Sequence, residues 1–489
     1  MIHQYRLNGF NIVLDVNSGS VHCVDDVAYD IIRLFSQAKD EGKEPDREAV
    51  KREILKTYGE GGEKRPSAGD GAPAGAAEEP PVTARDVEET FADLDDLIRE
   101  EKLFAPDGFA PSAGVLKDRH TEVKALCLHV AHSCNLNCSY CFASQGNFHG
   151  DRALMSFETG KQALDFLVAN SGAHRNLEVD FFGGEPLLNW DVVKRLVAYG
   201  RSLEEGNGKH FRFTLTTNGV GVTDEVIDFA NREMNNVVMS LDGRKAVHDR
   251  FRTFLDGRGS YDVIVPKFQK FAKAREEAGL EYYIRGTFTH ANIDFTEDLF
   301  HMADLGFTRL SMEPVVSAPG TPYALTEEDL PEIFRQYEIL AKDMLRREKE
   351  GRPLVFYHYM LDLAGGPCIY KRISGCGSGT EYFAVTPWGD LYPCHQFVGE
   401  DQFKMGDIWQ GITREDVRQD FKMCNVYARE ECGDCWARLY CSGGCAANAF
   451  HGTGSIRGVY DYGCRIFRKR MECAIMMKVA EAFSQEGAE

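Results

Sequence analysis

The chain has 489 residues, of which 43% are hydrophobic, so two or three domains with real cores are expected. Its 76 acidic and 56 basic residues give a net charge of −20 without a Lys/Arg block, which argues against a nucleic-acid partner. No apolar run approaches the roughly 18 residues of a membrane span, and the N-terminus lacks a signal-peptide pattern. We therefore expect a cytoplasmic protein with no membrane partner.

Residues 1–104 predict a small winged-helix-like domain. Three short strand-like runs come first, at 4–7, 11–14 and 21–24. Three predicted helices follow: one capped by Asp25 or Asp26, one at 47–58, and one marked by an apolar stripe from Val87 to Ile98. Such a unit is either a structural extension or a module that docks an extended leader peptide at a sheet edge. Its acidic composition argues against DNA. Within it, 59–81 has ten Gly or Pro and no Leu, Ile, Val or aromatic residue, which predicts a disordered insertion.

Residues 121–315 alternate strand-like and helix-like segments. The predicted strands are 125–131, 177–182, 211–217, 236–241, 282–289 and 308–312, and the predicted helices are 157–170, 190–203, 223–233, 262–275 and 296–305. This alternation predicts a parallel sheet with right-handed crossovers. Six units predict a partial (β/α)6 barrel rather than a closed barrel of eight. A linking helical region, 316–367, includes a long charged helix at 326–350, and a Cys-rich domain, 368–489, follows.

The fifteen cysteines are grouped, which indicates metal or redox chemistry rather than a disulfide scaffold. Cys134, Cys138 and Cys141 fall within eight residues, directly after the predicted strand 125–131. The carboxyl end of a strand is where such folds place their chemistry. A closed zinc site takes four ligands, whereas an iron–sulfur cubane held by three cysteines leaves one iron open. A zinc knuckle with a distant fourth ligand is the alternative.

The C-x3-C-x2-C spacing, with Tyr140 before its last cysteine, resembles the radical S-adenosylmethionine (SAM) superfamily. The resemblance implies a [4Fe–4S] cluster whose open iron binds SAM, and an adenosyl radical formed from it. It also implies these SAM contacts: Gly183, Gly184, Glu185, Ser240 and Arg252. Arg250 and Arg285 are rivals of Arg252. Residues 217–219 either line the same cavity or form a plain turn.

A second cysteine array resembles the SPASM domain, which carries auxiliary [4Fe–4S] clusters. By that resemblance one cluster is held by Cys432, Cys435, Cys441 and Cys464, and the other by Cys376, Cys394 and Cys445. The fourth ligand of the latter is either Cys368 or a substrate thiolate. A pair of zinc sites is the alternative, although seven thiols fit it badly. The remaining cysteines are expected to be small buried apolar residues, namely Cys23, Cys127, Cys424 and Cys473. His395 is expected to support Cys394 rather than to bind metal.

Outside 59–81, the chain closely resembles the maturases of six-cysteine (SCIFF) peptides, from Met1-Ile2-His3-Gln4-Tyr5 to Cys441-Ser442-Gly443-Gly444-Cys445. This implies thioether formation between Cys sulfur and acceptor carbons of a ribosomally made, leader-bearing Cys-rich precursor peptide. It also implies three clusters, SAM and an external electron donor. The alternatives are an anaerobic sulfatase maturase, which makes formylglycine from Cys or Ser, and a non-enzymatic iron–sulfur protein. The sequence identifies no general base, and Glu313 is a candidate only by position.

Overall fold

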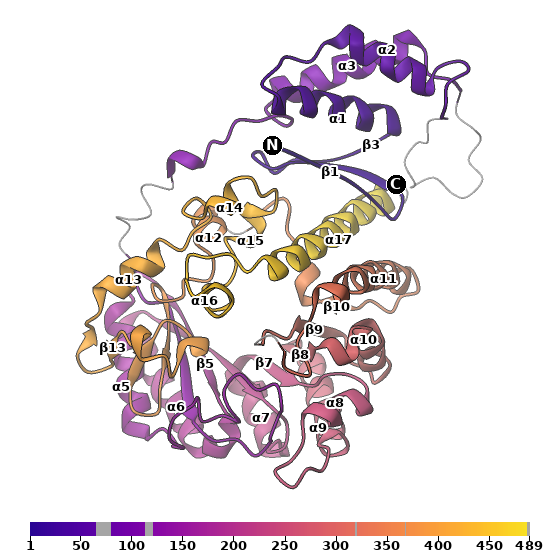
Figure 1. The fold of residues 1–489 in the computed structure, drawn as a ribbon. Coiled ribbons are helices and arrows are strands. Elements are labelled where there is room, and N and C mark those ends of the chain that lie inside the picture. Colours follow the sequence, from indigo (N-terminus) through magenta and orange to yellow (C-terminus); the bar gives the residue numbers. More distant parts are fainter. Residues whose placement is uncertain (65–79, 113–120, 318–319, 367, 487–489) are drawn as a thin grey trace.

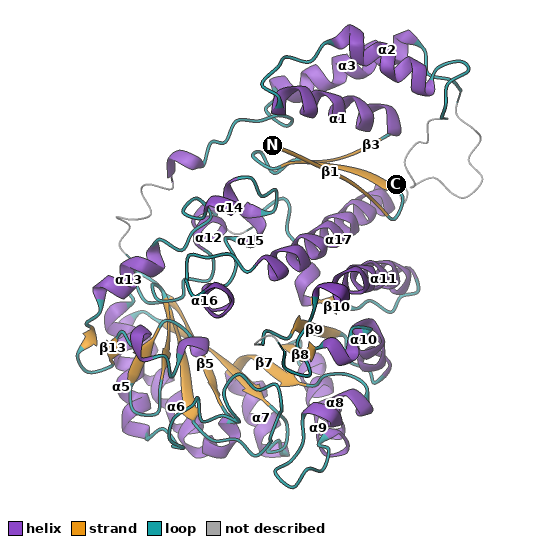
Figure 2. Cartoon of the chain, viewed as in Figure 1, coloured by secondary structure: helices purple, strands orange, loops and turns teal. Residues whose placement is uncertain are grey.

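The computed structural model describes residues 1–64, 80–112, 121–317, 320–366 and 368–486 (Figure 1). Most of the segment predicted as a disordered insertion, 65–79 out of 59–81, lies outside the described residues. Figure 2 shows an N-terminal unit of three strands and three helices, a large sheet flanked by helices, and a loop-rich C-terminal region. No helix in the described part is long and apolar enough to cross a membrane.

The N-terminal unit pairs a three-stranded antiparallel sheet with three helices. Its elements are β1 (Ile2–Leu7), β2 (Phe10–Asp15), β3 (Val21–Val24), α1 (Asp26–Asp40), α2 (Arg47–Tyr58) and α3 (Ala84–Arg99). They lie at or within a few residues of their predicted positions. Asp25 accepts a hydrogen bond from the Ala28 amide and so caps α1. Phe35 of α1 stacks on Phe91 of α3 in a separate small core (centroids 5.7 Å apart), so this unit has its own apolar interior.

The central sheet has eleven strands among the described residues, and six consecutive ones run parallel. These are β4 (Ala125–Ala131), β5 (Asn176–Gly183), β6 (His210–Thr217), β7 (Met234–Ser240), β8 (Glu281–Phe288) and β9 (Arg309–Pro314). The connecting helices are α5 (Phe157–Asn170), α6 (Trp190–Asn207), α7 (Asp224–Glu233), α8 (Lys245–Phe251), α9 (Tyr261–Glu277) and α10 (Phe295–Asp304). The α/β alternation is as predicted, apart from the short helix α8, which the sequence did not reveal.

The sheet continues beyond the six predicted strands at both edges. β10 (Val355–Phe356) pairs in parallel with β9, and β11 (Tyr382–Val385) pairs in parallel with β4. Three short antiparallel strands then follow: β12 (Asp390–Tyr392), β13 (Gly406–Asp407) and β14 (Gly411–Ile412). The first part of the predicted Cys-rich domain therefore forms one edge of the central sheet. Strands of two to four residues carry too little alternation to be predicted.

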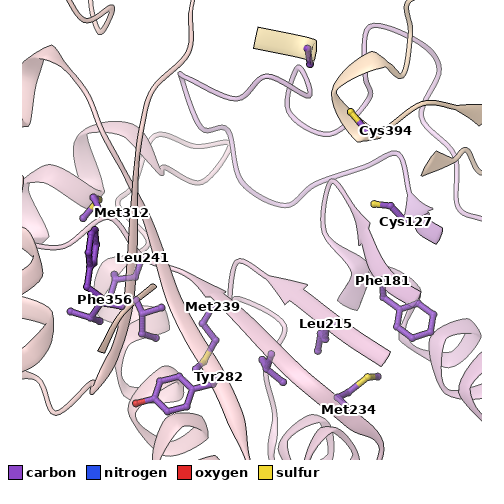
Figure 3. Packing of buried hydrophobic residues seen from close by; sticks show 14 of the residues in the cluster. Cys127, Phe181, Leu215, Met234, Met239, Leu241, Tyr282, Met312, Phe356 and Cys394 are labelled. Carbon is purple, nitrogen blue, oxygen red and sulfur yellow. The ribbon is translucent and has the colours of Figure 1, made fainter. Parts of the chain in front are cut away.

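The two faces of the parallel sheet differ in polarity. Leu215, Met239 and Tyr282 belong to the fully buried layer beneath the helices, part of which is shown in Figure 3. Successive side chains of a strand point to opposite faces, and the alternate positions Thr214 and Thr216 are only half-buried. The face away from the helices is thus available for polar side chains.

The C-terminal region consists of short helices and one long one. The short helices are α12 (Ile369–Ser374), α13 (Glu415–Lys422), α14 (Glu430–Gly433), α15 (Arg438–Cys441) and α16 (Ala446–Thr453). The long helix α17 (Asp461–Glu486) was not predicted from the sequence. It packs against α11 (Leu330–Lys349), which is shorter than the predicted 326–350 because its first turn is a 3₁₀ helix, Glu327–Asp329. It also reaches β1 of the N-terminal unit (Figure 1).

Candidate active site

Three thiols gather at the carboxyl end of β4. Cys134, Cys138 and Cys141 are free cysteines, and they lie close enough for their charges to interact. Burial raises the pKa of Cys134 to about 11 and that of Cys138 to about 12. These thiols are therefore neutral near pH 7 unless a bound cation displaces their protons, as metal coordination does.

Among the described residues, no three or more His, Cys, Asp or Glu side chains are grouped tightly enough to hold a single metal ion. A structural zinc ion draws four ligands to about 2.0–2.3 Å. In a four-iron cluster the Cys ligands are distributed over different irons. A loose group of three free thiols fits a cluster better than one ion.

The Gly183–Glu185 turn lies directly against the cysteine loop. The Gly184 amide donates to the Ala131 carbonyl (2.8 Å), and the Glu185 amide donates to the Ser133 carbonyl (3.0 Å). A Cβ on Gly184 would lie 2.2 Å from the Ser133 oxygen, so no other residue fits there without movement. The paired glycines allow β5 to approach the loop that carries Cys134.

The side chain of Glu185 is used by the protein itself. It is 1% exposed, and its carboxylate accepts hydrogen bonds from Thr217 Oγ1 (2.8 Å), the Asn218 amide (2.8 Å) and the Leu187 amide (3.1 Å). Burial raises its pKa to about 7. Asn218 Nδ2 in turn lies 3.6 Å from Cys134 Sγ. Residues 217–219 are thus in contact with the cysteine loop rather than in a plain turn.

A buried carboxylate, Asp242, holds the other side of the loop. It accepts hydrogen bonds from the Tyr140 hydroxyl (2.5 Å), Arg252 Nε (3.0 Å) and the Thr287 amide (3.1 Å). The Arg252 guanidinium also lies 5.6 Å from the centre of the Tyr140 ring. Sequence reasoning singled out Arg252 but missed Asp242, although its place two residues after Ser240 at the end of β7 was a usable signal.

The rival arginines lie elsewhere. The Arg250 guanidinium stacks over the Phe251 ring (5.5 Å). Arg285 is opposite Ser240 in the β7–β8 register, and its guanidinium is 4.0 Å from Glu313. Arg252 is therefore the arginine that the structure brings to the cysteine loop.

Glu313, at the end of β9, lies beside an arginine and a buried histidine. Its carboxylate is 3.3 Å from His358 and 3.3 Å from Arg470. Burial lowers the pKa of His358 to about 3, so its ring is neutral near pH 7. Burial acts to raise the pKa of Glu313, but the charges of Arg470 and Arg285 hold that pKa below its ordinary value. A carboxylate kept ionised in this way is a weak base, so its position supports an electrostatic role.

The structure assembles the downstream thiols into two further groups. Charge interactions connect the members of each group, which are Cys376, Cys394 and Cys445 in the first, and Cys432, Cys435, Cys441 and Cys464 in the second. Burial raises the pKa of Cys394 and of Cys441 to about 12. Cys368 is exposed.

The leftover cysteines follow the prediction only in part. Cys127 and Cys473 are fully buried, as predicted. The prediction is wrong for Cys23 and Cys424, which are half-buried. Cys23 lies on the edge strand β3, and Cys424 lines a pocket beside Cys376.

A histidine pair beside the cysteine loop was missed. His129 Nδ1 and His132 Nε2 are 3.1 Å apart and buried, and His395 contacts the ring of Phe182 (centroids 5.1 Å apart). Burial lowers the pKa of His132 and of His395 to about 4. The neutral ring of His395, the residue after Cys394, also contacts Phe142, the residue after Cys141 (centroids 5.6 Å apart). The alternation of β4, which turns His129 away from the helices, was the available signal.

A sequence profile described as the Radical SAM superfamily matches residues 128–284. The likeness to this superfamily covers less than half of the chain. The matched segment contains the three-cysteine loop, the glycine turn, and Asp242 with Tyr140 and Arg252.

Relatives of known sequence extend the likeness beyond the domain. A cysteine-type anaerobic sulfatase-maturating enzyme of Clostridium novyi is 26% identical over 331 residues, covering 65% of this chain and 86% of that protein. The uncharacterized protein MJ0907 of Methanocaldococcus jannaschii is 29% identical over 284 residues, covering 57% and 86%.

Two solved structures share the fold. The anSMEcpe enzyme with AdoMet and the Kp18Cys peptide aligns with a TM-score of 0.59 at 20% identity, over 74% of this chain and 99% of that one. Streptococcus suis SuiB with S-adenosylmethionine aligns with a TM-score of 0.51 at 16% identity, over 94% of this chain and 97% of that one. The second alignment takes in most of the chain.

Proposed function

We propose that the enzyme forms intramolecular thioether cross-links between Cys sulfur and acceptor carbons of a ribosomally made, Cys-rich precursor peptide. The main observation in support of this proposal is that one chain combines three separate thiol groups with a small N-terminal sheet unit. The fold likeness to SuiB, whose complex with the precursor peptide SuiA aligns over 95% of this chain with a TM-score of 0.50, supports this arrangement.

The thiol groups fit three [4Fe–4S] clusters. Cys134, Cys138 and Cys141 would hold the SAM-binding cluster, which with bound SAM supplies a carbon-centred radical for hydrogen abstraction. The four-thiol group can satisfy a cluster alone. The three-thiol group would leave a fourth place for Cys368 or for the sulfur of a substrate Cys. In this proposal residues 368–489 act as a SPASM domain.

The residues around the loop would bind and orient SAM. The carbonyls of Gly183 and Gly184 can accept hydrogen bonds from its ammonium group, because the Glu185 carboxylate is already engaged by protein donors. In this proposal Ser240, at the end of β7, and the Arg252 guanidinium would contact its ribose and carboxylate. The Asp242 contact holds Arg252 in one orientation.

The N-terminal sheet would dock the leader peptide at β3. The opposite edge strand, β1, is occupied by α17, since the Tyr5 hydroxyl donates to the Glu472 carbonyl (2.9 Å) and His3 contacts the Glu472 carboxylate (3.2 Å). Within the described residues β3 pairs only with β2. An extended peptide can add to such an edge through its main chain.

Formylglycine formation is the second candidate. It is favoured by the 26% identity to the Clostridium novyi sulfatase-maturating enzyme. The sulfatase-maturase fold leaves about a quarter of this chain unaligned, whereas SuiB leaves little. The additional N-terminal unit thus favours a leader-guided reaction.

Mass spectrometry distinguishes the two. A Cys-rich peptide encoded beside this gene is incubated anaerobically with reconstituted enzyme, SAM and reductant. Loss of hydrogen pairs with fewer alkylatable thiols, and fragmentation that stops between linked residues, is the expected result. Conversion of one thiol to an aldehyde would establish the second candidate.

Deletion of residues 1–104 tests leader docking. We expect modification of the full-length precursor to be lost, while reductive cleavage of SAM without peptide continues. Unchanged modification by the truncated enzyme would contradict docking on the N-terminal unit and leave the radical SAM assignment intact.

A further inference from the structure

An uncompensated buried arginine lies in the segment between Cys424 and Cys432. Arg429 is 3% exposed, and no carboxylate among the described residues forms an ion pair with it. Its Nη2 donates to the Ile456 carbonyl (2.8 Å), while its buried Nε has no partner in the described part of the chain. Burying a cation is costly unless a negative group pairs with it. Arg429 therefore needs a counter-charge that the amino acids alone do not supply.

Arg429 lies beside the segments that carry both downstream thiol groups. The Cys432 amide donates to the Arg429 carbonyl (3.1 Å). Arg429 also lines a pocket with Cys376, Cys424 and Gly444, the residue before Cys445. One arginine thus lies next to residues of each predicted auxiliary cluster.

The backbone is shaped to admit this guanidinium. Gly443 lies in the loop that joins Cys441 to Cys445, with φ of +85°. A Cβ on Gly443 would lie 2.9 Å from Arg429 Nη1. The glycine therefore allows the charge to approach the loop that carries one thiol of each group.

We propose that Arg429 is the shared counter-charge of the two auxiliary [4Fe–4S] clusters and raises the reduction potential of both. The inference rests on the proposed function, in which these thiols hold clusters. Cluster potentials depend on net charge and on hydrogen bonds to the sulfurs. Reduction adds negative charge, so a fixed buried cation stabilises the reduced state. Arg429 is a positioning residue, since it acts through the clusters and does not touch substrate.

Arg438 provides a matched control. It is also a buried arginine of this region (6% exposed), but its guanidinium is neutralised by Asp107 (2.9 Å) and donates to Asn17 Oδ1 (2.8 Å). The Arg438 charge is not among the main causes of the pKa shifts of Cys432, Cys441 and Cys445. Arg438→Gln removes a buried guanidinium without removing an uncompensated charge.

The test uses the full chain with Cys134, Cys138 and Cys141 all changed to Ala, so that only the auxiliary thiols remain. After anaerobic reconstitution, iron is counted and the clusters are titrated with a reductant under EPR. At a fixed potential, Arg429→Gln is expected to lower the reduced-to-oxidised ratio by about tenfold, which is a shift of 59 mV for one electron. Arg429→Lys and Arg438→Gln are expected to stay near the parent protein.

The possible results distinguish a failure of the inference about Arg429 from a failure of the proposed function. If the parent protein with the three Ala substitutions binds no iron, the auxiliary clusters are absent and both fail. If it binds iron and Arg429→Gln titrates like the parent, only the inference is overturned. If Arg429→Gln and a second neutral variant, Arg429→Met, fail to load iron while Arg429→Lys loads fully, the charge is required for assembly and the proposal stands. If the Lys variant fails with them, the side chain serves packing and the proposal is wrong.

Discussion

Single buried charges determine how the cysteine loop is held. Asp242 is fully buried and pairs with Arg252, whose side chain is 12% exposed. Removing one partner of a buried ion pair costs about 3–5 kcal/mol, because the other charge is left uncompensated. We expect Asp242→Ala to lower the free energy of unfolding of the apoprotein by that amount in urea titrations.

Tyr140→Phe is the graded control for this substitution. It deletes only the hydroxyl that donates to Asp242, and a hydrogen bond to a charged group contributes about 1.5–3 kcal/mol. If Asp242→Ala and Tyr140→Phe lowered the free energy of unfolding equally, the ion pair between Asp242 and Arg252 would contribute nothing to stability.

A half-buried carboxylate on β5, Asp180, predicts a pH dependence. Burial, and next the Glu178 carboxylate, raise the pKa of Asp180 to about 6. Since the unfolded value is about 3.9, the folded state binds more protons between these two values, and stability falls as pH rises through that window. Asp180→Asn removes this loss. We expect the variant to exceed the wild type in melting temperature at pH 7.5, with the difference shrinking toward pH 4.

If the melting temperatures of Asp180→Asn and the wild type differed by the same amount at every pH, the raised pKa of Asp180 would be contradicted. Glu178→Gln is the companion variant, because it removes the secondary cause and leaves the burial of Asp180 in place. We expect Glu178→Gln to give only a small part of the increase in melting temperature at pH 7.5 that is expected for Asp180→Asn.

The residues of the site were predictable where chemistry dictates type and spacing. The three-cysteine loop was named from its local spacing and Arg252 from the resemblance to radical SAM proteins, and the structure brings them together. Asp242 and Arg429 were missed, because a buried polar residue is recognised by its partners, which come from distant parts of the chain. The His129–His132 pair was missed although its members are three residues apart. No local spacing connects Asp242 to Tyr140 or Arg429 to Gly443.

At the scale of elements, the end of a helix can be tested alone. Thr83 caps α3, where its hydroxyl accepts a hydrogen bond from the Asp86 amide and the Asp86 carboxylate accepts one from the Thr83 amide. Replacing such a cap with Ala costs roughly 1 kcal/mol. We expect Thr83→Ala to lower the melting temperature of the N-terminal unit, measured by circular dichroism on the apoprotein.

The half-buried Thr90 on the same helix is the control. Its hydroxyl donates to the Asp86 carbonyl within the helix and caps nothing, so Thr90→Ala is expected to be neutral or slightly stabilising. A loss equal to that of Thr83→Ala would mean that the cap makes no particular contribution.

The helices and strands that were predicted well have a strong hydrophobic periodicity in the sequence, and those that were missed do not. The alternating segments of 121–315 gave strands and helices close to the observed bounds. The helix α17 escaped because its second half is buried on nearly all sides, from Cys473 to Ala480, so no single apolar stripe marks it. Strands β10–β14 are too short to show alternation.

At the scale of the whole molecule, aromatic packing connects the N-terminal unit to the cysteine-rich region. The His3 ring stacks on Trp436 with centroids 3.9 Å apart, and Trp436 directly follows Cys435. We expect Trp436→Ala to increase deuterium uptake of β1 in hydrogen-exchange mass spectrometry. The exposed Trp409 provides the control, because Trp409→Ala removes an equal ring far from β1. Unchanged uptake in the Trp436 variant would show that α17 alone holds this strand.

One helix, α17, meets every part of the architecture. Its first turn carries Cys464, its Arg470 contacts Glu313 of the central sheet, and its Glu472 carbonyl accepts a hydrogen bond from the Tyr5 hydroxyl. A chimera that exchanges residues 1–104 between related proteins would therefore present a foreign surface to α17. Recombination boundaries for engineered substrate choice should be placed so that β1 and the second half of α17 are inherited from the same parent.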